Sequence, residues 1–174
     1  MRRGTHTIRS AYTNQHKAAD MYLPREYVLD NGDFELNMQL TGLHIFPTSN
    51  DDTAGAGDKL SNETIFFVVS TSNDGALPQS PSISPEEYGP FDLRPSDSRQ
   101  IAWGICAPFQ NLTYTLIDPD HIIPENVFVN CWTLTTAGTL ANQLPYSLGY
   151  MLKLEQRKST GSEALLYQVK EASR

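Results

Sequence analysis

Alternation of apolar and polar residues is the main signal along this chain. It is clearest at residues 34–41, where every even-numbered position is apolar and every odd-numbered position is polar. A period of two is typical of a β-strand with one buried face and one solvent-facing side. Gly42 interrupts the alternation, and Leu43 and Ile45 continue it on a shifted register. This interruption predicts a β-bulge.

Five further segments have the pattern of strands, whereas the end of the chain has the pattern of a helix. The pattern Thr160-Gly161-Ser162-Glu163 is a capping box followed by apolar residues at helical spacing. It predicts one short amphipathic helix at about residues 160–171. Antiparallel strands joined by irregular loops pack as two sheets, so we expect an all-β sandwich of the jelly-roll type. The other predicted strands are residues 64–71, 99–106, 112–116, 126–136 and 148–154, with a weaker one at 27–29.

The length of 174 residues fits one domain. We expect a flexible basic arm at residues 1–19 and a single sandwich domain at residues 20–174. Long loops are predicted at residues 48–63 and 72–98. The second has five prolines, too many for a helix or a central strand, and loops of this length are usually functional or partly disordered.

Charge is distributed unevenly. The chain carries a net charge of −7 and only 19% charged residues, which suits β-structure better than a helical bundle. Residues 20–152 hold 17 acidic residues against four basic ones, whereas residues 1–19 hold no acidic residue. The cations of the predicted arm could neutralise phosphates as a modest, salt-sensitive nucleic-acid tether, or they could be scattered charges on a frayed terminus. These cations are Arg2, Arg3, Arg9 and Lys17.

Motifs that carry catalysis are absent from the sequence. It has no G-x-S-x-G, P-loop, G-x-G-x-x-G, H-E-x-x-H or C-x-x-C motif, and its four histidines are far apart. We therefore expect no enzyme and no resident cofactor, and we expect His44 on the solvent face of a strand. The longest apolar run, residues 65–69, is far shorter than the roughly 20 residues that span a bilayer. No apolar stretch follows the first arginines, so neither a membrane span nor a signal peptide is expected.

The densest polar cluster is Asp118-Pro119-Asp120-His121. Its oxygen ligands and imidazole could bind a divalent cation such as Ca²⁺. The alternative, which we favour, is an Asp-Pro-Asp turn whose carboxylates accept local backbone N–H bonds. Cys106 and Cys131 lie in strand-like runs, where two buried free thiols are expected, although one disulfide is an alternative.

Aromatic residues are expected mainly in the core, with a sugar- or base-stacking platform as the alternative. Tyr88 and Phe91 are exceptions because they lie in the proline-rich loop. Rings in such a loop either dock on their own sheet or pack on a neighbouring subunit.

A short basic arm (Arg2 to Lys17), one domain of long strands with large loops, and the lack of a catalytic set together resemble a single jelly-roll viral capsid (coat) protein. The resemblance implies a structural protein that self-assembles as a homo-oligomer, for example an icosahedral shell. It implies a protein of the virion, made in the host cytoplasm, whose arm faces inward and interlocks subunits or contacts packaged nucleic acid.

Two other classes of protein remain open. A carbohydrate- or ligand-binding, lectin-like sandwich would expose tryptophan or tyrosine on a concave face. A β-sandwich hydrolase would need paired carboxylates in one cleft, and no spacing in the sequence selects such a pair.

Overall fold

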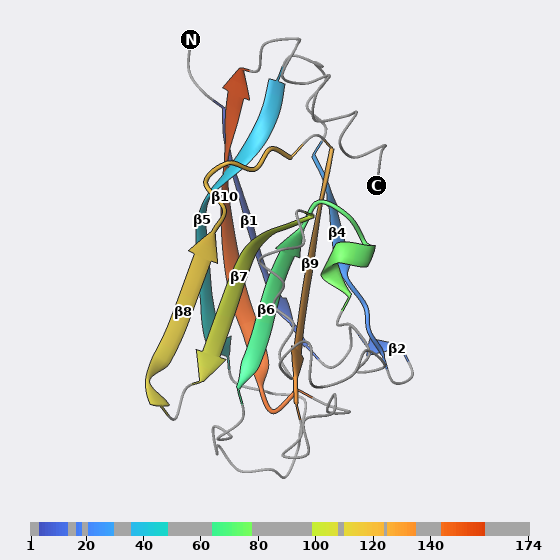
Figure 1. Ribbon diagram of the computed structural model, residues 1–174. Helices are drawn as coiled ribbons and strands as arrows, with labels where there is room; N and C mark the ends of the chain where they lie inside the picture. Colours follow the sequence, from blue (N-terminus) through green and yellow to red (C-terminus); the bar gives the residue numbers. More distant parts are fainter. Residues whose placement is uncertain are drawn as a thin grey trace, which may run out of the picture.

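Two antiparallel sheets make up most of the part of the protein that its computed structural model describes (Figure 1). The structure describes residues 4–13, 17–18, 21–29, 36–48, 64–77, 99–107, 110–123, 125–134 and 144–158. The elements in chain order are β1 (Thr5–Tyr12), β2 (Lys17–Ala18), β3 (Met21–Tyr22), β4 (Arg25–Val28), β5 (Leu36–Thr48), β6 (Ile65–Ser70), the 3-10 helix η2 (Asp74–Ala76), β7 (Gln100–Ala107), β8 (Leu112–Ile117), β9 (Asn126–Thr133) and β10 (Ser147–Lys158).

The strand order of the two sheets confirms the predicted all-β sandwich. One sheet has three strands in the order β1-β10-β5, and the other has five in the order β4-β9-β6-β7-β8. The strands β2 and β3 form a separate short ribbon. No helix among the described residues has the length and apolar character needed to cross a bilayer.

The predicted bulge in β5 is present. Lys153 of β10 pairs with Gly42 and Leu154 pairs with Leu40, so Thr41 is the extra residue on β5. Without the bulge, Leu40 and Leu43 would face opposite sides of the sheet, because they are three positions apart. With the bulge, both are buried in the core.

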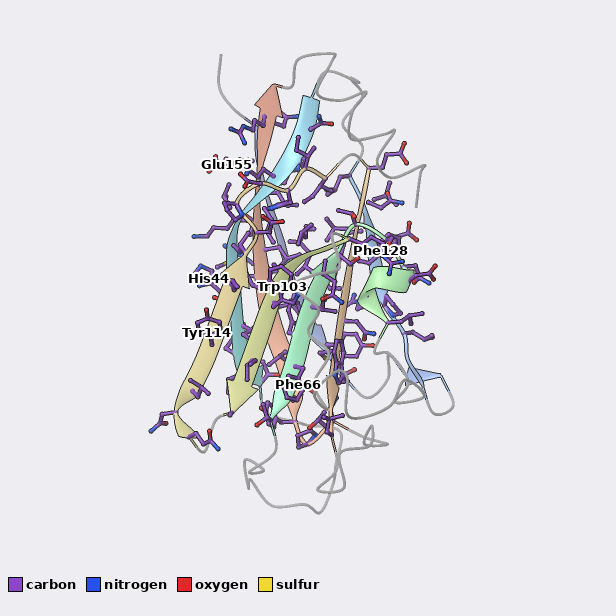
Figure 2. The ribbon with its side chains drawn as sticks, in the orientation of Figure 1. His44, Phe66, Trp103, Tyr114, Phe128 and Glu155 are labelled. Carbon is purple, nitrogen blue, oxygen red and sulfur yellow. The ribbon has the colours of Figure 1, made fainter. Side chains whose placement is uncertain are left out.

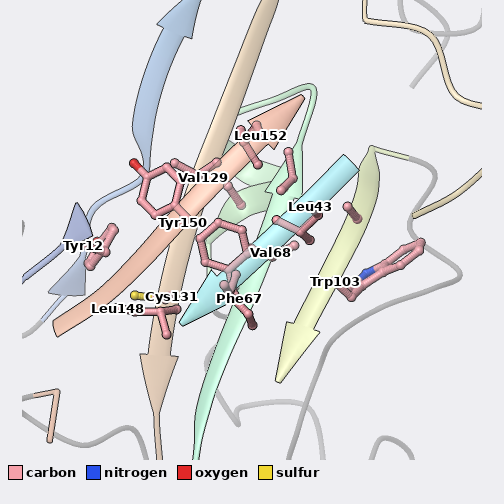
Figure 3. Close-up of a cluster of buried hydrophobic side chains, with 14 of the residues drawn as sticks. Tyr12, Leu43, Phe67, Val68, Trp103, Val129, Cys131, Leu148, Tyr150 and Leu152 are labelled. Atoms are coloured by element: carbon pink, nitrogen blue, oxygen red, sulfur yellow. The ribbon is translucent and has the colours of Figure 1, made fainter. Parts of the chain in front are cut away.

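The core lies between the two sheets and is centred on β6 (Figure 3). All six residues of β6 are buried, as its uninterrupted apolar run predicts for a central strand. Phe67 reaches the facing sheet, where its ring centroid lies 5.2 Å from that of Tyr150. Gly104 of β7 leaves room for the Ile45 side chain of the facing sheet, since a Cβ there would lie 2.7 Å from Cδ1 of Ile45.

The prediction of a flexible arm is wrong for residues 5–12. They form β1, which pairs with β10 along its full length. Tyr12 is buried and its hydroxyl donates to the carbonyl oxygen of Leu23 at 2.6 Å, which fixes the end of the strand. The strand was hidden because three of its four outward positions and two of its four inward positions are polar or charged.

Several predicted features lie outside the described residues. These are the helix at residues 160–171, residues 1–3 of the arm, and almost all of the loop at 48–63. Residues 78–98 of the proline-rich loop also lie outside, but both of its ends are described. The backbone N–H of Thr71 donates to the carbonyl of Arg99 at 2.9 Å, and Nε2 of Gln100 donates to the carbonyl of Gly75, also at 2.9 Å. The loop therefore leaves and re-enters the sheet at one place.

Candidate interaction surface

The edge strand β8 carries a row of exposed apolar side chains, here called the β8 row. It consists of Leu112, Tyr114 and Leu116, which are 44%, 53% and 46% exposed. The alternation predicted for this strand is present, but its apolar side faces outward. Figure 2 shows Tyr114 on β8, at the side of the sandwich. Contiguous exposed apolar side chains are typical of an interaction site.

The apolar surface continues from the β8 row onto the neighbouring strand. Leu116 pairs with Trp103 of β7 and Tyr114 pairs with Ile105, so these side chains share the outer face of the sheet. Trp103 is nearly buried, and its indole N–H donates to Oε1 of Gln100 at 2.8 Å. In Figure 3, Trp103 lies apart from the inter-sheet cluster around Phe67. The five-stranded sheet is thus apolar on both faces.

Part of this outer face is covered by the chain that follows β6. The buried amide of Asn130 donates through Nδ2 to the carbonyl of Ala76 at 2.9 Å, and its Oδ1 accepts the N–H of Cys131. Ala76, at the end of η2, is fully buried against the sheet. Because both the nitrogen and the oxygen of the Asn130 amide are hydrogen-bonded, this polar side chain can be buried in an apolar face of the sheet.

The opposite sheet presents a different surface. Arg9 of β1 and Lys153 and Arg157 of β10 are exposed on its outer side. Glu155 lies between the two β10 cations, and no ion pair joins it to any of them within the described ranges. Nη1 of Arg157 donates to Oε1 of Gln39 on β5 at 3.3 Å. This sheet face is basic, although the chain as a whole is acidic.

A polar cluster ties the two sheets together along β1 and β4. Nη1 of Arg25 donates to Oγ of Ser10 at 2.5 Å and to the carbonyl of Ala11 at 2.9 Å. The hydroxyls of Tyr27 and Tyr150 are 2.5 Å apart. Burial and the hydrogen bond to Tyr27 raise the pKa of the Tyr150 phenol, so this ring stays neutral. The cluster therefore joins the two sheets through hydrogen bonds.

The Asp-Pro-Asp turn is present as predicted. Oδ1 of Asp118 accepts the backbone N–H of Asp120 at 3.0 Å. His121, by contrast, is buried, and both its ring nitrogens are engaged: Nε2 accepts the N–H of Leu40 at 2.9 Å, and Nδ1 bonds to the carbonyl of Asp118. The imidazole therefore has no lone pair to offer to a metal. Across the described residues, no group of three or more histidine, cysteine, aspartate or glutamate side chains could hold one.

Both cysteines are free and buried, as expected. Burial raises the pKa of the Cys106 thiol, and it raises that of Cys131 further. A reactive cysteine needs a stabilised thiolate, whereas these surroundings favour the neutral thiol. The two thiols act as small apolar core residues.

The structure describes two of the four cations predicted for the arm. Arg9 lies in β1, and Lys17 lies in β2. Arg2, Arg3, Tyr88 and Phe91 lie outside the described residues. His44 is exposed on β5, as predicted. Sequence reasoning missed the β8 row, although its signal was readable, because β8 and the two residues before it contain no charged residue.

Comparisons with known protein families, curated proteins and solved structures find no match for this chain. The function is therefore argued from the fold and from these surfaces.

Proposed function

We propose that this protein is a structural, non-catalytic jelly-roll subunit that assembles with copies of itself into a shell, as a viral coat protein does. A jelly roll is a long hairpin of eight strands that is wrapped into two sheets. The pairing supports this assignment. β1 pairs with β10, β4 pairs with β9, β6 pairs with β7, and β5 lies beside β8. Among the eight strands of the two sheets, the first therefore lies beside the last, the second lies beside the next to last, and the series continues inward in the same way.

The observation that carries the proposal of self-assembly is the β8 row. Leu112, Tyr114 and Leu116 lie on an edge strand that has no charged residue and no proline. Soluble proteins commonly protect edge strands with lysine, proline or a bulge. Within the described part of β8 none of these devices is present. A surface of this kind is stabilised when a second copy covers it.

The basic face of the three-stranded sheet supports a packaged nucleic acid as a further partner. Arg9, Lys153 and Arg157 would contact phosphates in place of the flexible arm that the sequence predicts. Three cations give weak binding that falls with salt.

The alternative is a lectin-like module that binds a carbohydrate on Tyr114. An aromatic ring exposed on a strand, with Trp103 close by on the neighbouring strand, is what favours it.

Light scattering after size exclusion, with negative-stain imaging, separates the two functions. We expect the full-length protein at neutral pH to form discrete multimers or closed particles, with or without added calcium. A protein that stays monomeric at high concentration would contradict the proposal. Retardation of that monomer on a glycan column would support the lectin-like alternative. An absorbance ratio typical of nucleic acid in the particles, lost at high salt, would support the proposed nucleic-acid partner.

A further inference from the structure

The connection between β8 and β9 fastens the two sheets along one side of the sandwich. We call residues 118–123 the closing segment. At its start, the N–H of Asp118 donates to the carbonyl of Ile101 in the five-stranded sheet at 2.9 Å. At its end, Ile123 exchanges two backbone hydrogen bonds with Met38 of β5, at 2.8 and 3.1 Å. The closing segment therefore occupies the edge of β5 at Met38, near one end of that strand.

His121 supplies the central link of this closure. Its Nε2 accepts the N–H of Leu40 at 2.9 Å, and its Nδ1 donates to the carbonyl of Asp118. This pattern requires a neutral ring with its proton on Nδ1, since Nε2 must keep a lone pair. The ring is only 5% exposed, so water cannot easily replace either partner.

The groups around His121 favour its neutral form. The residues of β5 that face it, Met38 to Leu40, have no titratable side chain. Asp118 is the charged neighbour whose field acts on the ring, and it favours the protonated form, as does the bond to its carbonyl. Burial outweighs both effects and lowers the pKa of His121 below its ordinary value of 6.5.

We propose that His121 is an acid-sensitive fastener, and that its protonation releases the closing segment from β5. A proton taken from solvent by Nε2 turns the acceptor of the Leu40 N–H into a second donor. Two N–H groups then face each other in a buried site, and neither has an acceptor. The bonds of the closing segment to Met38 and Leu40 separate, and the edge of β5 becomes free to pair with another strand.

This inference deepens the proposed function, because a freed edge on the subunit would change the contacts between copies. It rests on the proposed function only for that consequence.

The direction of the pH effect follows from the lowered pKa. A base with a lower pKa in the closed state stabilises that state fully above its ordinary value of about 6.5. The stabilisation is lost as the pH falls from there through the lowered pKa. Over that window the equilibrium constant for opening rises up to tenfold for each pH unit.

Hydrogen exchange of the full chain, followed by NMR, tests this. We expect the protection factors of the Met38, Leu40 and Ile123 amides, corrected for intrinsic exchange, to fall up to tenfold per pH unit below about 6.5. Amides in the centre of β6 should keep their protection. In His121→Gln the side-chain oxygen can still accept the Leu40 N–H but does not titrate, so the pH dependence should vanish. His44→Gln, which removes the exposed histidine of β5, should behave like the wild type.

Protection that is independent of pH in the wild type, or equally dependent on pH in His121→Gln, would overturn the proposal. If His121→Gln does not fold, the ring signals of wild-type His121 decide instead, because its titration must coincide with the loss of Leu40 protection. The measurement uses the unassembled chain. If the closing segment opens with pH but the chain does not assemble, the proposal for His121 stands and the proposed shell function is refuted. If the chain assembles but shows no pH-dependent opening, the proposed function stands and the proposal for His121 is refuted.

Discussion

Replacing Phe67 with alanine is expected to lower the free energy of unfolding by about 3–5 kcal/mol. Phe67 is fully buried at the centre of β6 and is the ring that meets Tyr150 across the two sheets. The substitution removes most of an aromatic side chain and leaves a cavity that neighbours on two sheets cannot both fill. A domain of this size has about 5–15 kcal/mol of stability in total, so a large part would be lost.

Urea unfolding followed by tryptophan fluorescence measures this effect. The matched control is Phe46→Ala, which removes the same ring from a half-exposed position on the outer face of β5. This control should cost less than about 1 kcal/mol, since surface substitutions usually have small effects. Equal losses for the two variants would contradict the assignment of the core to the space between the sheets.

Introducing lysine at Tyr114 is expected to weaken assembly strongly while leaving the subunit folded. Tyr114 is the most exposed member of the β8 row and lies at its centre. A lysine there places a charge inside any contact that covers the row, where an unpaired buried charge is strongly unfavourable. Charged side chains are also a natural device for blocking association at an edge strand. We expect at least a tenfold rise in the concentration needed for multimers.

Sedimentation velocity over a concentration series gives this result directly, with circular dichroism as the check of folding. Val28→Lys is the matched control, because it adds the same charge at an exposed apolar position on β4, the other edge strand of the same sheet. It should assemble at the same concentration as the wild type. Unchanged assembly of Tyr114→Lys would show that copies do not meet through the β8 row.

Local sequence patterns predicted much of the fold. The alternation at residues 34–41 and its interruption at Gly42 gave β5 and its bulge, because period and register are properties of the segment alone. The uninterrupted apolar run of β6 indicated burial on both faces. The Asp-Pro-Asp turn was predictable for the same reason, since its hydrogen bond joins residues two apart.

The candidate sites were less predictable because they depend on partners far along the chain. Alternation in β8 shows that its two faces differ, but not which one meets the core. Here the outer face of the sheet is apolar as well, so the row at Tyr114 faces outward. The role of His121 depends on Leu40, which is 81 residues away. The strand β1 was missed because its sequence is dominated by outward polar residues, and only its pairing with β10 stabilises it.

The two ends of the proline-rich loop lie at one place on the sheet, and this has a practical consequence for engineering. The chain leaves the sheet after Ser70 and returns at Gln100, and hydrogen bonds from Thr71 to Arg99 and from Gln100 to Gly75 join the two ends at one corner. A peptide that replaces residues 78–98 would start and finish at fixed neighbouring points, whatever its length, with a closure cost that grows only slowly with added residues. This corner is therefore the natural place to graft a foreign epitope or an affinity tag for display.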